Sequence, residues 1–196
     1  RIAAGTPGPE PLVVLHGVLF ASWFLIFFVQ TMLAAGGRLM LHRRIGAAAA
    51  ILAALMTVDG PLTAIAAARR GHLGPDGSAF MLVMIVDVLG FAMGVAAAIR
   101  WRHRAEIHKR FMLLGTTSML PPAIFRWPLF AGHPAAVPIV LLAFLAAPLI
   151  RDRLTGHRIH PVSLWGGVTL FLSGPLRIAF SHSAAWHHVA MWLIQR

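Results

Sequence analysis

The sequence predicts an all-α fold, a polytopic transmembrane helical bundle of about six spans with a C-terminal interfacial amphipathic helix. Of its 196 residues, 58% are hydrophobic and only 12% are charged, and the mean hydropathy is +0.76. The apolar residues come in blocks, and about 20 apolar residues are needed to cross the hydrocarbon layer of a bilayer. Basic residues collect in alternate loops between these blocks. We therefore expect a single transmembrane domain over residues 1–196.

Six apolar runs are candidates for the spans. They cover residues 11–35, 45–68, 79–99, 111–130, 135–150 and 161–180. The fifth run is short and contains Pro138 and Pro148, so we expect it to be tilted, broken or shielded by its neighbours. The first run is too long for the core of a signal peptide and ends in a basic corner. We therefore expect it to be a span.

Residues 184–195 are too short to cross a bilayer. On a helix, one face of this segment would carry Trp186, Val189, Trp192 and Leu193. Tryptophan is enriched where a membrane meets water. The pattern predicts a helix that lies in the membrane interface with tryptophan as its anchor.

The distribution of Lys and Arg predicts the orientation of the spans. Eleven of the 17 lie in the corners after the first, third and fifth spans, namely Arg38, Arg43, Arg44, Arg100, Arg102, Arg104, Lys109, Arg110, Arg151, Arg153 and Arg158. The positive-inside rule places these corners in the cytoplasm and both termini outside. It also explains the net charge of +11 without a nucleic-acid partner. The chain has no cysteine, which excludes disulfides and thiolate metal sites.

Three corners resemble one another, because His42–Ile45, His108–Phe111 and His157–Ile159 each introduce an inside-to-outside helix. The helices that follow contain breakers at a comparable depth, at Gly60-Pro61, Pro121-Pro122 and Gly174-Pro175. One interpretation is a degenerate hairpin repeat. The other interpretation is that any helical hairpin with positive-inside bias shows a similar basic corner, without an internal repeat.

Charged residues lie at related depths within the outer halves of five spans. Asp59 and Asp87 are each about 12–15 Å from the outer end of their helix, at ~1.5 Å per residue. Arg126, Arg177 and His16 also fall in this half. Because a charge in a bilayer normally pairs or faces a cavity, we expect a pocket for a quinone, a substrate or a proton path. The alternative is that Asp–Arg pairs simply hold helices together.

Histidine is the second candidate group, with 11 in the chain. A b-type haem needs one or two facing imidazoles between apolar walls. His42 and His108 begin the second and fourth spans, and His16 lies inside the first. We expect His42 and His108 as haem-iron ligands, or, on the alternative interpretation, as interfacial residues beside topology signals. The chain has no phosphate-binding loop, nucleophile elbow or zinc-protease motif.

Four short motifs carry a family resemblance. They are HRRIG at His42–Gly46, HKRFM at His108–Met112, Pro-Ala-x-x-Arg at Pro122–Arg126 and IHPVSLWGG at Ile159–Gly167. With these motifs the chain resembles an uncharacterised bacterial integral membrane family loosely allied to the cytochrome b561 and ferric-reductase superfamily. The resemblance implies haem b and a ligand role for His16, His42 and His108. Members of the b561 group place ligands in four central helices, and the third and sixth spans here contain no histidine, so at most one haem is expected.

These observations lead to an expected function with two alternatives. We expect a membrane electron-transfer protein of the bacterial inner membrane, like a b-type cytochrome, with a quinone or proton pocket. The pocket would be lined by His16, Asp59, Asp87, Arg126 and Arg177. The first alternative is a non-catalytic accessory subunit of a larger membrane complex. The second is a small proton-coupled transporter that uses the Asp59 and Asp87 layer, and the sequence does not decide whether the chain is an enzyme.

Overall fold

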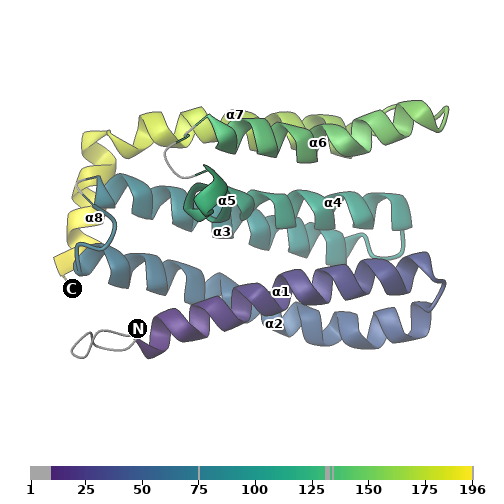
Figure 1. Cartoon of the computed structure of the whole chain (residues 1–196), viewed down its shortest axis with the longest axis horizontal. Helices are drawn as coiled ribbons and strands as arrows, with labels where there is room; N and C mark the ends of the chain where they lie inside the picture. The colour runs from purple at the N-terminus through teal and green to yellow at the C-terminus, as the bar shows by residue number, and fades with distance from the viewer. Residues whose placement is uncertain (1–9, 75, 131–132, 134, 196) are drawn as a thin grey trace. The chain divides into compact units, whose positions relative to one another are not determined.

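The computed structural model describes residues 10–74, 76–130, 133 and 135–195, and this part of the chain is all-α, with no strand (Figure 1). Its helices are α1 (Pro11–Ala35), α2 (Leu39–Arg69), α3 (Gly77–Arg100), α4 (Ala105–Ser118), α5 (Leu120–Arg126), η1 (Pro128–Phe130), α6 (Ala136–Leu154), α7 (Pro161–Ser181) and α8 (Ala184–Gln195). The predicted all-α class is confirmed.

Contacts divide the chain into two compact units. Unit 1 is Arg1–Thr63, with α1 and most of α2, and unit 2 is Ala64–Arg196, with the end of α2 and all later helices.

Four helices are long and apolar enough to cross a membrane. They are α1, α2, α3 and α7, which correspond to the first, second, third and sixth predicted spans. The bounds of α1 and α7 agree with the prediction almost to the residue because each helix has a proline in its first turn. Proline is favourable there, since the first N–H groups of a helix have no intrahelical acceptor.

The fourth predicted span, residues 111–130, is wrong as one continuous helix. In the structure α4 ends at Ser118, and Met119 separates it from the seven-residue α5. Pro121 and Pro122 lie in the first turn of α5. A proline inside a helix removes a hydrogen bond and clashes with the preceding turn, so the pair ends one helix and starts the next.

Two other helices extend beyond their predicted spans. α2 begins at Leu39, so that the basic corner His42–Arg44 lies within its first turns. Gly37 makes this early return possible, because its φ of 71° is a conformation that glycine adopts without strain. α6 continues through Pro148 to Leu154 as one helix, so of the alternatives expected for this run the break does not occur.

In unit 1 the turn between α1 and α2 is fixed by Gln30. Its Nε2 donates to the His42 carbonyl at 3.0 Å. A methyl group at Gly46 would lie 3.1 Å from the same nitrogen, so glycine at this position lets the amide approach α2. Trp23 is only 2% exposed and anchors the middle of α1.

In unit 2 small residues bring α3 and α4 into close contact. A Cβ at Gly94 would lie 2.5 Å from the Cα of Gly115, and one at Gly90 would lie 3.3 Å from the Cβ of Ser118. Gly90 and Gly94 form a small-xxx-small pair, which allows backbones of membrane helices to approach closely. This contact positions α4 against the stretch of α3 that contains Asp87.

The C-terminal helix α8 forms as predicted, and Figure 1 shows it running across the ends of α3 and α7. Trp186 is only 7% exposed and its Nε1 donates to the Ser78 carbonyl at 2.8 Å. The prediction that Trp186 anchors the helix to lipid is therefore wrong, because this indole packs in the protein. Val189 and Trp192 do remain exposed.

Arg69 ties the far end of α8 to the end of α2. Its Nη2 and Nε both donate to the Leu193 carbonyl, at 2.7 and 3.2 Å. A guanidinium is favourable there because the last carbonyls of a helix carry partial negative charge. Leu193 also packs on the apolar cluster around Met81, so α8 is part of the core of unit 2.

Candidate functional site

The predicted layer of charges contains two buried pairs, and the first joins α1 to α2 in unit 1. His16 Nδ1 lies 2.7 Å from Asp59 Oδ2. Asp59 is 6% exposed and His16 is 21% exposed. The Phe20 ring, one turn along α1, lies 4.1 Å from the imidazole ring centre to centre. The pairing explains how an aspartate is tolerated inside an apolar helix.

The other oxygen of Asp59 is in a different situation. Asp59 Oδ1 is buried, and so is Thr63 Oγ1, and neither has a hydrogen-bond partner among the described residues. The two side chains are four residues apart on α2, so they lie on the same helical face. Buried polar atoms are normally hydrogen-bonded, so these two oxygens mark a site with unused acceptor capacity.

The second pair lies in unit 2, where Arg177 Nη1 on α7 binds Asp87 Oδ1 on α3. Ser173, one turn before Arg177, receives its remaining bonds: its carbonyl accepts from Arg177 Nε at 3.2 Å and its Oγ from Nη2 at 3.1 Å. Ser118 Oγ on α4 donates to the Asp87 carbonyl at 3.0 Å. Asp87 is 2% exposed and Arg177 is 8% exposed, so this pair is almost fully enclosed.

The depth of each residue in its predicted span does not decide which acid pairs with which base. The structure pairs Asp87 with Arg177, and Asp59 with His16 rather than with an arginine. Arg126 ends α5, and its side chain lies outside the described residues. Four residues of the predicted five-residue layer therefore form two pairs, one in each unit.

His42 and His108 occupy matching positions in two successive hairpins. His42 Nδ1 lies 3.3 Å from the Gln30 carbonyl, and His108 Nδ1 lies 2.8 Å from the Ala98 carbonyl. In each case the histidine is at the start of the return helix and the carbonyl near the end of the helix before it. Because a carbonyl only accepts, Nδ1 carries the hydrogen and the lone pair is on Nε2, as in most metal-bound histidines.

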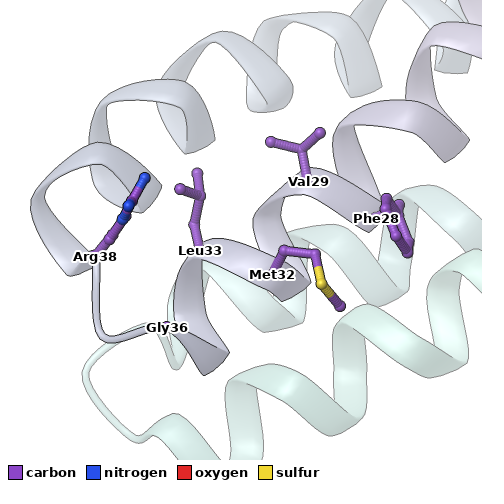
Figure 2. Close-up of a pocket in the computed structure, with 6 residues that line it drawn as sticks. All are labelled: Phe28, Val29, Met32, Leu33, Gly36 and Arg38. Carbon is purple, nitrogen blue, oxygen red and sulfur yellow. The ribbon is translucent and has the colours of Figure 1, made fainter.

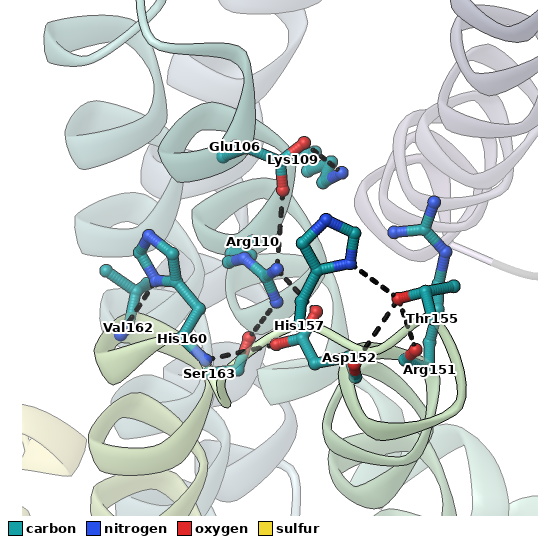
Figure 3. A network of polar contacts seen from close by, with 10 residues as sticks. All are labelled: Glu106, Lys109, Arg110, Arg151, Asp152, Thr155, His157, His160, Val162 and Ser163. Atoms are coloured by element: carbon teal, nitrogen blue, oxygen red, sulfur yellow. Dashed lines mark hydrogen bonds and ion pairs between the residues drawn. The ribbon is translucent and has the colours of Figure 1, made fainter.

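Sequence reasoning missed a polar network in unit 2 that joins α4, α6 and α7 (Figure 3). Arg110 Nη2 donates to Asp152 Oδ1 and its Nη1 to Ser163 Oγ, both at 2.7 Å. The His160 N–H donates to Asp152 Oδ2 at 3.1 Å. Arg110, Asp152 and Ser163 are all buried. The sequence indicates only an orientation role for Arg110.

The electrostatics of this network are favourable to the carboxylate. The Arg110 side-chain hydrogen bond, followed by that of the His160 N–H, holds the pKa of Asp152 below its usual 3.8. An acid in the last turn of a helix is unfavourable because the carbonyls there carry partial negative charge. The position of Asp152 in the sequence, between two arginines near the end of α6, could therefore have indicated that it has a specific basic partner.

A shallow groove of about 400 Å³ lies at the end of α1 in unit 1 (Figure 2). It is lined by Phe28, Val29, Met32, Leu33, Gly36 and Arg38, none of which is a predicted site residue. No cluster of three or more His, Cys, Asp or Glu side chains able to hold a metal ion occurs within the described ranges. The candidate chemistry therefore rests on the buried pairs and the two hairpin histidines.

Comparisons of this chain with family models, with curated proteins and with solved structures return no match. The class that the fold defines is a helical protein with four helices fit to cross a membrane.

Proposed function

We propose that the chain is an electron-transfer protein of the bacterial inner membrane that resembles a b-type cytochrome. In this proposal α4 with α5, and α6, complete a six-span bundle with both termini outside. The alternate-loop distribution of Lys and Arg supports that orientation, and the apolar faces of α1, α2, α3 and α7 support contact with the bilayer.

The observation that carries the proposal is the matched hydrogen bonding of His42 and His108. Each imidazole has its Nδ1–H directed to a backbone carbonyl of the preceding helix. This bond fixes the tautomer and the ring plane, and it raises the basicity of Nε2. These are the properties that an axial ligand of haem iron requires, and so the two residues fit the group.

Haem b, when bound, supplies the one-electron chemistry. The chain's own residues hold the imidazoles, through the Gln30 carbonyl in unit 1 and the Ala98 carbonyl in unit 2. His16 is the third candidate, and its contact with Asp59 supports a role in proton handling. We propose that the outer charged residues serve a quinone or proton site, with His16 and Asp59 in unit 1 and Asp87, Arg126 and Arg177 in unit 2.

A visible absorption spectrum of the purified protein tests this proposal. We expect a Soret band that shifts on reduction in the wild type, and its loss in His42→Ala and in His108→Ala. His188→Ala is the matched control, because His188 is exposed on α8 and should leave the band unchanged. A wild type without any reducible band, or alanine variants that keep it, would rule the proposal out.

One observation favours a second candidate, an accessory subunit of a larger membrane complex. Only 6% of the most apolar stretch of α1 is buried, so most of this helix is available for lipid or for helices of another subunit. A stable partner that co-purifies in mild detergent, together with no redox absorbance, would support the subunit and exclude the cytochrome.

A further inference from the structure

Asp59 in unit 1 is a buried acid without a permanent counter-charge. Its one bonded neighbour among the described residues, His16, is neutral or cationic according to its protonation, so it is not a permanent cation. Arginine stays protonated in proteins, so Asp87 has a permanent positive partner in Arg177. With neutral imidazole, His16 and Asp59 together carry one negative charge inside apolar helices.

A single buried negative charge is unfavourable unless a cation compensates it. The structure provides oxygen atoms for such a cation. Asp59 Oδ1 and Thr63 Oγ1 are buried without a partner among the described residues, and their side chains are 6% and 7% exposed. Oxygen ligands of this kind suit small hard cations.

We propose that Asp59, with His16 and Thr63, forms a binding site for one small monovalent cation, either a proton or a sodium ion. Binding brings the site to zero net charge, and release restores the negative charge. A proton is held at the His16–Asp59 pair, and a sodium ion lies between Asp59 Oδ1 and Thr63 Oγ1. Reversible binding of this type is what an ion-coupled transporter requires, so this activity goes beyond electron transfer and does not depend on haem.

No other titratable group of unit 1 lies in the interior of α1 or α2. The remaining charged or titratable residues of the described part of unit 1 are at helix ends: Glu10 before α1, Arg38 in the turn, and His42, Arg43 and Arg44 at the start of α2. At ~1.5 Å per residue, His42 is about 25 Å along α2 from Asp59. Within the described part of unit 1, His16 is therefore the titratable group that faces Asp59.

Labelling with an apolar carbodiimide tests the proposal on the whole purified protein. The reagent adds to a protonated carboxyl group in apolar surroundings and leaves a stable N-acylurea, which mass spectrometry locates. We expect labelling of Asp59 that falls as pH rises. No labelling of Asp59 at any pH would overturn the proposal.

Sodium chloride and choline chloride at equal concentration separate the two cations. If sodium binds, labelling of Asp59 falls about fivefold when sodium is about four times its dissociation constant, and choline has no effect. If a proton is the only ligand, the two salts give the same labelling and only pH matters. Labelling that responds neither to pH nor to sodium would contradict both forms.

Thr63→Val and Thr31→Val are a matched pair of variants for the sodium site. Thr63→Val removes the second oxygen, so sodium protection should be lost while the pH dependence remains. Thr31 is exposed on α1, and its hydroxyl bonds to the Phe27 carbonyl, so Thr31→Val should behave as wild type. A sodium-protected wild type whose protection survives Thr63→Val would place the ion elsewhere. The haem spectrum is unaffected in every case, so this site and the electron-transfer proposal fail separately.

Discussion

Asp59 and Asp87, two buried acids of the described residues, are stabilised in different ways. In unit 2, Asp87 binds Arg177, whose other two guanidinium nitrogens bond to Ser173, so all three nitrogens of a permanent cation make a hydrogen bond. In unit 1, Asp59 binds His16, a base whose charge depends on its protonation. The first acid has a permanent cation as its partner, and the second does not.

The surroundings of Asp87 are also more tightly packed than those of the His16–Asp59 pair. Asp87 lies where α3, α4 and α7 meet, with Gly90 and Gly94 bringing α4 close and Ser118 bonded to its backbone. His16 is on α1, a helix with few buried residues, and keeps 21% of its side chain exposed. A rigid, enclosed pair suits structural support, whereas a pair with an accessible edge suits exchange of a proton or ion.

The largest expected effect is on unit 2. Arg177→Leu leaves Asp87 buried without its cation, and breaking such a pair costs about 3–5 kcal/mol of folding free energy. Thermal unfolding in detergent should show a large loss of stability. The double variant Asp87→Asn with Arg177→Leu should recover part of it, because the uncompensated charge is gone. A single variant as stable as wild type would show that the pair is not a structural support.

Glycine substitutions test the packing difference. Gly94→Ala places a methyl group 2.5 Å from the Gly115 Cα, and overpacking of this kind costs about 1–3 kcal/mol. Gly17→Ala on α1 is the matched control, because an added Cβ there meets nothing within 4 Å and alanine is the better helix former. Unfolding temperatures should fall for the first and not for the second; equal shifts would contradict the close contact of α3 and α4.

The sequence predicts the depth of the buried charged side chains along their helices, but it does not predict which of them pair. The rise per residue predicts that Asp59 and His16 share a depth, whereas their pairing depends on the rotation of each helix. Because His16 lies among apolar residues on every side of α1, the sequence does not indicate which face is turned inward. The Asp87–Arg177 pair was open for the same reason.

The span and network errors have specific causes. In the sequence, Pro121-Pro122 is compatible with a helix breaker inside one continuous span and with the start of a new helix. The structure has the second arrangement, with both prolines in the first turn of α5. Arg110 belongs to a basic corner, and a charge there suits orientation and a buried ion pair equally well. Only the approach of Asp152 from α6 distinguishes the two. By contrast, Pro11 and Pro161 made the starts of α1 and α7 predictable.

A smaller effect is expected when the unit 1 pair is broken. His16→Gln removes the base but leaves a side chain that can donate to Asp59, and an incompletely satisfied buried group costs about 1–2 kcal/mol. Thermal unfolding should therefore show a smaller shift than for Arg177→Leu. A loss as large as that of Arg177→Leu would make the two pairs equivalent.

The smallest expected effect concerns Asp152, an arginine-bound acid at the end of α6, outside the four candidate spans. Arg110 holds the pKa of Asp152 below 3.8, so its contribution to stability is present above that value and is lost as pH falls through the lowered pKa. At pH of about 6, Asp152→Asn should unfold at a lower temperature than wild type, and at pH of about 3 the difference should narrow. Glu106→Gln is the control, because Glu106 is 61% exposed and surface ion pairs contribute little. If the difference in unfolding temperature between wild type and Asp152→Asn stays constant with pH, packing and not charge makes the contact between Arg110 and Asp152 stabilising. The permanent charge of Arg177 would then explain less of the contrast between Asp87 and Asp59.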